Sequence, residues 1–126
     1  MKYPNYFPQG CPPDDAVAKE IDAYRICKSS IITHSDFLSF YEEGKKIYGN
    51  ILGYGISIFS NINEAYTVLK MPAHRKEYIA KGITNSDCGV IKYTPSSKHS
   101  SHYTWWLYEN ATPEKYFQII KEQGNE

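Results

Sequence analysis

The chain has 126 residues, and its 14 lysines and arginines balance 14 aspartates and glutamates, so the formal net charge at pH 7 is zero. This length fits one domain with a hydrophobic core, and the balanced charge argues against strong non-specific binding to nucleic acid or to an anionic membrane. No segment reads as an export signal or a membrane span, and the three cysteines lack the paired spacing of a disulfide framework. We therefore expect a cytoplasmic protein without membrane association, whose oligomeric state is open.

Residues 1–18 carry most of the prolines. Proline removes a backbone donor and holds the preceding residue extended. The same segment contains Tyr3, Tyr6 and Phe7, whereas disordered tails are usually poor in aromatic residues. The sequence therefore predicts a proline-rich N-terminal arm over 1–18 that packs on a body formed by 19–126.

Several segments of the body are rich in residues that favour strands, with apolar and polar positions in alternation. These segments are 23–28, 54–59, 78–83, 89–94, 102–108 and 116–121. A turn-rich link over 84–88 joins the third segment to the fourth, which predicts that these two strands pair as antiparallel neighbours. The segment Thr112-Pro113-Glu114 reads as a turn or a single helical turn before the last strand.

Two helices are expected between the strands. Thr33 to Asp36 has the spacing of a capping box and predicts a helix over 34–46. A second helix is predicted over 61–70, with Ser60 as its cap and Pro72 as its stop. Together these elements predict an α+β fold: a single domain with a mostly antiparallel five- to six-stranded sheet and two principal helices.

Trp105 and Trp106 are consecutive, so on a strand they point to opposite faces of the sheet. One is expected in the core. The other is either exposed beside a groove, which favours a binding surface, or buried because both faces of the sheet are covered.

The polar segment 95–101 leads directly into the aromatic strand and offers hydroxyl and imidazole groups. Such groups hydrogen-bond and stack a planar ligand, so we predict that His99, His102 and Trp105 contribute to ligand binding. Two histidines do not make a metal site, and no metal is expected.

Two runs of residues carry a family resemblance. Tyr24-Arg25-Ile26 lies on an early strand, and the run Tyr-Gly-Ile-Ser-Ile-Phe-Ser over 54–60 enters the second predicted helix. This order of elements resembles ADP-ribosyltransferase-like folds, and among them the RES-domain toxins and the RNA 2′-phosphotransferases.

The resemblance implies roles for particular residues and NAD as the cofactor. Arg25 would hold the dinucleotide, Ser57 or Tyr54 would line the nicotinamide pocket, and Glu109 would steady the ribose in an oxocarbenium-like transition state. A guanidinium binds a pyrophosphate bidentately, and a carboxylate stabilises a positive ribosyl centre. Taken singly, Arg25 and Glu109 are more often ordinary surface charges.

Two functions of different classes follow. The first is a nucleotide- or NAD-handling protein of ADP-ribosyltransferase-like type, or a descendant that has lost catalysis. The second is a non-catalytic interaction module, such as a small cytoplasmic partner in a toxin or defence system, which would use exposed tyrosines and a tryptophan to bind a protein. A ligand screen with NAD, ADP-ribose and other nucleotides separates the two.

Overall fold

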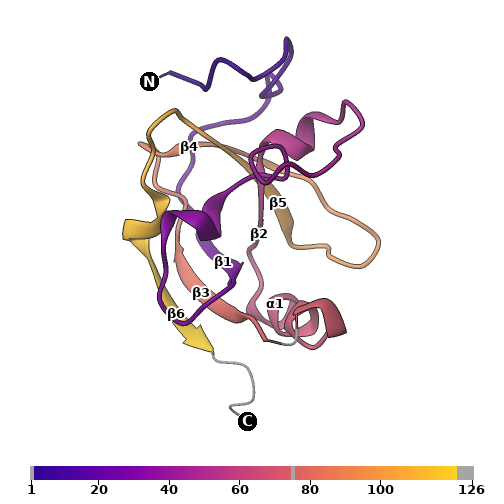
Figure 1. Cartoon of the computed structure of the whole chain (residues 1–126), viewed down its shortest axis with the longest axis vertical. Helices are drawn as coiled ribbons and strands as arrows, with labels where there is room; N and C mark the ends of the chain where they lie inside the picture. Colours follow the sequence, from indigo (N-terminus) through magenta and orange to yellow (C-terminus); the bar gives the residue numbers. More distant parts are fainter. Residues whose placement is uncertain (1, 75, 122–126) are drawn as a thin grey trace.

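A six-stranded antiparallel sheet forms the centre of the computed structural model, which describes residues 2–74 and 76–121 (Figure 1). The strands lie in the order β4-β5-β2-β1-β3-β6. Their bounds are β1 Asp22–Cys27, β2 Ile56–Phe59, β3 Tyr78–Ile83, β4 Gly89–Tyr93, β5 His102–Leu107 and β6 Phe117–Lys121. The α-helix α1 spans Ile62–Leu69, and short 3-10 turns span η1 His34–Phe37, η2 Ile51–Tyr54, η3 Pro72–His74 and η4 Pro113–Tyr116. The predicted α+β class and the mostly antiparallel sheet are confirmed.

The predicted pairing of 78–83 with 89–94 is wrong. β3 lies between β1 and β6, whereas β4 pairs with β5 at the edge of the sheet. The link between them cannot act as a hairpin because its first residue, Thr84, is buried and bonded to the segment before β1. The Thr84 hydroxyl donates to the carbonyl of Lys19 over 2.6 Å and accepts the N–H of Ile21 over 2.9 Å. β4 is therefore an edge strand, separated from β3 by β5, β2 and β1.

The predicted helix over 34–46 is also wrong, since helical structure there is limited to the single turn η1. Leu38 is already extended, with φ −87° and ψ 139°. In an α-helix the carbonyl of Asp36 would accept the N–H of Phe40. That carbonyl instead accepts a hydrogen bond from the Arg25 side chain over 3.0 Å. Over residues 2–74 and 76–121 the fold thus has one principal helix.

The helix predicted over 61–70 is confirmed as α1, but its cap is Asn61, not Ser60. The Asn61 side-chain oxygen accepts the N–H of Asn63 over 2.8 Å, whereas the Ser60 hydroxyl donates to the carbonyl of Ser101. The buried residues of α1 are Ala65, Val68 and Leu69. No helix among the described residues is long and apolar enough to cross a membrane.

Both faces of the sheet are covered at the two tryptophans, so of the two alternatives left open by the sequence the second holds. Trp105 and Trp106 are each 0% exposed. Trp105 packs near Phe117, with ring centroids 6.1 Å apart. On the other face, the Trp106 indole N–H donates to the carbonyl of Ile51 in η2 over 3.0 Å.

The N-terminal segment runs along the β4 edge of the sheet and over η2 (Figure 1). Val17 forms an isolated antiparallel bridge with Ile91 of β4, closed by bonds of 2.9 and 2.7 Å. The Tyr3 ring lies 5.1 Å from that of Tyr108, and the Phe7 ring lies 5.9 Å from that of Tyr54. The Val17 bridge covers part of an edge that would otherwise present free backbone groups, and the ring contacts hold the rest of the segment against the body.

The pairing of β3 with β6 can be tested at Gly82. A Cβ at this position would lie 2.2 Å from the carbonyl oxygen of Tyr116, so the two backbones would have to separate. We expect Gly82→Ala to lower the free energy of unfolding by about 1–3 kcal/mol, measured by urea denaturation. Lys81→Ala, at an exposed position of the same strand, is the control and should stay within about 0.5 kcal/mol of the parent. Equal stability of the two variants would contradict this pairing.

Candidate functional site

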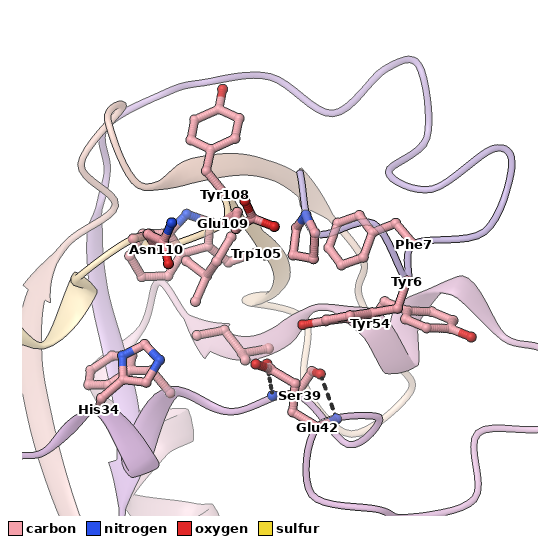
Figure 2. Close-up of a pocket in the computed structure, with 15 residues that line it drawn as sticks. Tyr6, Phe7, His34, Ser39, Glu42, Tyr54, Trp105, Tyr108, Glu109 and Asn110 are labelled. Atoms are coloured by element: carbon pink, nitrogen blue, oxygen red, sulfur yellow. Dashed lines mark hydrogen bonds between the residues drawn. The ribbon is translucent and has the colours of Figure 1, made fainter. Parts of the chain in front are cut away.

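The predicted site residues divide between two clefts. The larger, which we call the main cleft, has a volume of about 540 Å³ and is lined by Arg25, Ser57, His99 and His102. The smaller, the aromatic pocket, has a volume of about 270 Å³ and is lined by Tyr54, Trp105 and Glu109 (Figure 2). The structure therefore brings four of the predicted residues together and places the other three elsewhere.

The main cleft opens where β1 and β2 stop pairing. These strands share a single register pair, Tyr24 with Phe59, whereas β1 pairs with β3 along its whole length. The Arg25 side chain links the two strands beyond that point: Nε donates to the Asp36 carbonyl over 3.0 Å, and Nη1 donates to the Ser57 carbonyl over 2.8 Å. Arg25 thus ties β1 to β2 and to η1 where the ladder has ended.

The remaining N–H groups of the Arg25 guanidinium make no hydrogen bond to a described residue, although the guanidinium also lies over the Phe37 ring, 5.9 Å from its centroid. Burial lowers the pKa of Arg25, and the nearby Glu43 and Asp36 carboxylates oppose that shift. An arginine stays charged at neutral pH because its ordinary pKa is so high. The main cleft therefore holds a partly buried positive charge with donors available to a ligand.

A hydrogen-bonded row crosses from β2 to β5 in the same cleft. Ser57 pairs with Thr104, which makes His102 its diagonal neighbour across the ladder. His102 Nε2 lies 2.8 Å from the Ser57 hydroxyl. On the other side of the ring, Nδ1 lies 2.9 Å from the Thr94 carbonyl oxygen and 3.0 Å from the Thr94 hydroxyl.

These partners determine the tautomer of His102. A carbonyl oxygen only accepts hydrogen bonds, so Nδ1 carries the proton and Nε2 accepts the proton of the Ser57 hydroxyl. Burial lowers the pKa of His102 below its ordinary value of 6.5; the bond to Thr94 opposes this shift, and His99 and Arg25 reinforce it. The imidazole is therefore neutral at pH 7, with a basic nitrogen directed at the serine.

Glu64 on α1 holds the loop that carries His99. One carboxylate oxygen accepts the N–H and hydroxyl of Ser101, and the other accepts the N–H and hydroxyl of Ser100 over 3.0 Å each. These bonds lower the pKa of Glu64 to about 2. Next to this loop, the Phe59 ring contacts the imidazoles of His99 and His102 edge-on, with centroids 5.4 and 5.7 Å apart.

The rest of the main cleft combines paired charges with an apolar wall. Glu43 pairs with Lys28 and Lys45, at 2.6 and 3.4 Å, and His74 pairs with Glu77. The apolar wall consists of Leu38, Phe40, Leu52, Val68 and Met71. The carboxylates that line this cleft thus already have partners in the protein.

Glu109 is one of the residues that line the aromatic pocket (Figure 2), whereas Arg25 and Ser57 line the main cleft. The Glu109 side chain is half-exposed and lies 4.0 Å from the Lys2 ammonium. Tyr54 stacks on Tyr6, which comes from the N-terminal segment. Glu109 therefore does not face the residues that it was expected to assist.

Sequence reasoning missed Thr94 and Glu64, which orient His102 and the loop. Neither lies in a motif, and a threonine at the end of a strand or a glutamate in the first turn of a helix is an ordinary residue there. Their roles depend on bringing β2, β5 and α1 together, and no local pattern carries that information.

The comparisons with known proteins give no assignment: no family model matches the chain, and neither the curated proteins nor the solved structures contain a match. Among the described residues, no group of three or more His, Cys, Asp or Glu side chains is arranged to hold a metal ion. The functional argument therefore depends on the geometry of the main cleft.

The role of Glu64 gives a pH-dependent prediction. In Glu64→Gln one oxygen is replaced by an NH₂ group, which cannot accept from Ser100 or Ser101, so we expect a lower Tm at pH 7. The pKa of Glu64 in the folded protein is depressed from 4.5 to about 2. The charged carboxylate therefore stabilises the folded state above pH 4.5, and this stabilisation is lost as the pH falls toward 2. The Tm difference between parent and variant should shrink over this range.

Thermal unfolding followed by circular dichroism between pH 7 and pH 2 measures this difference. Glu109→Gln, which removes a half-exposed carboxylate from the other cleft, serves as the control and should leave the Tm at pH 7 nearly unchanged. A Tm difference for Glu64→Gln that stays constant down to pH 2 would show that its charge does not hold the loop.

Proposed function

We propose that the main cleft binds a nucleotide-like ligand, and that NAD or its ADP-ribose part belongs to this class. The observation that carries the proposal is the convergence of Arg25, Ser57 and His102 from three strands: Arg25 is bonded to the Ser57 carbonyl, and the Ser57 hydroxyl is bonded to His102. Two of these residues are those to which the ADP-ribosyltransferase-like resemblance assigns roles. The volume of about 540 Å³ is in the range of small-molecule sites.

The available N–H groups of Arg25 suit phosphate oxygens, because a guanidinium binds them in a fork. Lys28 and Lys45 also line the cleft and add positive charge beside the Glu43 carboxylate. His99 and the Phe59 ring lie next to His102, where a planar base would stack. The ligand would thus span the cleft from Arg25 to the 95–101 loop.

We do not propose that the protein catalyses ribosyl transfer with Glu109, the carboxylate that the resemblance implies. Glu109 lies in the aromatic pocket, and the carboxylates of the main cleft are paired. The ligand-binding function is therefore that of a nucleotide-handling protein without the expected carboxylate. We also propose a cytoplasmic location, in keeping with the three free cysteines.

A thermal-shift screen with ADP-ribose, NAD and AMP tests the proposal. A ligand at a hundredfold its dissociation constant stabilises the folded protein by about 2.7 kcal/mol. We expect at least one of these nucleotides to raise the Tm of the parent and of Glu109→Gln alike. Arg25→Lys should lose most of the shift, because an ammonium cannot reproduce the bidentate contacts.

The folding of Arg25→Lys is checked first by circular dichroism, and His99→Ala provides a second variant of the same cleft that leaves the Arg25 bonds in place. A shift lost in Glu109→Gln but kept in the other variants would move the ligand to the aromatic pocket. No shift with any nucleotide would favour the non-catalytic interaction module that recognises a protein partner.

A further inference from the structure

The row formed by Ser57, His102 and Thr94 has the arrangement that activates a serine for covalent chemistry. We propose that Ser57 is a nucleophile for acyl transfer, that His102 is its general base, and that the substrate is a carboxylic ester with an apolar acyl group. This inference goes beyond nucleotide binding and does not depend on it.

A serine hydroxyl becomes a nucleophile when a base lies within hydrogen-bond reach and a third group orients that base. The distance from Ser57 Oγ to His102 Nε2 is 2.8 Å. The Thr94 carbonyl takes the place of the orienting group, 2.9 Å from Nδ1. Because this oxygen accepts the Nδ1 proton, the nitrogen that faces the serine is the one without a proton.

Ser57 is exposed and lines the main cleft, so a substrate can reach its hydroxyl. The hydroxyls of Ser101 and Thr104, by contrast, belong to buried residues and are bonded to Glu64 and Thr94. Ser57 is therefore the hydroxyl of this row that combines a basic partner with access from solvent.

Arg25 supplies the positive charge that acyl transfer needs. Its Nη1 atom is 2.8 Å from the backbone carbonyl oxygen of Ser57, which places the guanidinium next to the residue that carries the nucleophile. The guanidinium also has N–H groups that make no hydrogen bond to a described residue. Donors and charge at this point stabilise the oxyanion that forms when a carbonyl is attacked.

The acyl group is assigned from the apolar residues that line the same cleft. Leu38, Val68 and Met71 line it without offering a charge. Phe40 and Leu52, which are 54% and 40% exposed, extend this apolar surface toward solvent. An acyl chain of several carbons would bury there, and burial of its CH₂ groups would favour binding.

The proposed reaction is a hydrolysis that needs water as its only co-reactant. Ser57 Oγ attacks the carbonyl carbon of the ester while its proton passes to His102 Nε2, and the alcohol leaves with that proton as the C–O bond breaks. Water then attacks the acyl-serine, gives a proton to Nε2, and forms the carboxylic acid as the bond to Ser57 Oγ breaks. The proton on Nε2 returns to Ser57, so the net change is an ester plus water to an acid plus an alcohol.

The test uses the full chain and a fluorophosphonate reagent, which phosphonylates activated serines. Intact-mass analysis and peptide mapping should find one phosphonyl group, on Ser57. Ser57→Ala should show no adduct, and His102→Ala should label at least about 100-fold more slowly, as expected for the loss of a general base. Ser60→Ala is the matched control, because Ser60 is an exposed serine next to the same strand whose hydroxyl is bonded to a carbonyl, and it should label like the parent.

Hydrolysis of p-nitrophenyl acetate, butyrate and octanoate by the same variants tests the acyl group. We expect kcat/KM to rise with chain length beyond acetate and to vanish in Ser57→Ala. Since Ser57→Ala removes one exposed hydroxyl and leaves the carbonyl bonded to Arg25, this variant should fold even if His102→Ala does not. Equal labelling of the parent and Ser57→Ala, or an adduct on another residue, would overturn the proposal. No nucleotide is used, so this failure is separate from failure of the thermal-shift screen.

Discussion

The two hydrogen bonds that the Arg25 side chain donates are the interactions on which the arrangement around the main cleft depends. Its guanidinium donates to the carbonyls of Asp36 and Ser57, and a partly buried charge is tolerated only with such partners. The bond to Asp36 uses a carbonyl that a helix would need, so the chain continues in extended form after η1. The bond to Ser57 joins β1 to β2 where their ladder ends. One residue therefore contacts both the 34–46 segment and the point where the main cleft opens.

The sequence predicts this fold well where the information is local. All the strands follow from alternating patterns, and α1 follows from an apolar face that ends before Pro72. The errors concern distant partners: Thr84 is bonded to Lys19, which prevents a hairpin, and Arg25 removes the acceptor on which the first helix depended. The Asp36 carboxylate of the predicted capping box accepts the N–H of Thr33 over 3.0 Å, but a cap cannot extend a helix in which the next carbonyl acceptor is already engaged.

The same limit applies to the candidate site. The sequence marks Arg25, Ser57 and His102 as candidate site residues, yet Ser57 and His102 are 45 positions apart in the chain. Their contact depends on β5 lying next to β2 with Ser57 opposite Thr104, and a shift of one residue in that register would turn His102 to the other face. The sequence can therefore suggest which residues belong to a site. It cannot show that they form a hydrogen-bonded row across a sheet, because that depends on the order and register of the strands.

The positions of the aromatic residues bear on which cleft can bind a ligand. Twelve tyrosines first suggest a binding surface, but in the structure Tyr3 and Tyr6 pack on Tyr108 and Tyr54 and hold the N-terminal segment against the body. Trp105, expected at the ligand, is fully buried in the core. Because these rings contribute to packing, the aromatic pocket is first of all the seam between the N-terminal segment and the sheet. In the main cleft, by contrast, a neutral imidazole, a hydroxyl and a guanidinium meet, and this is why we propose the ligand site there.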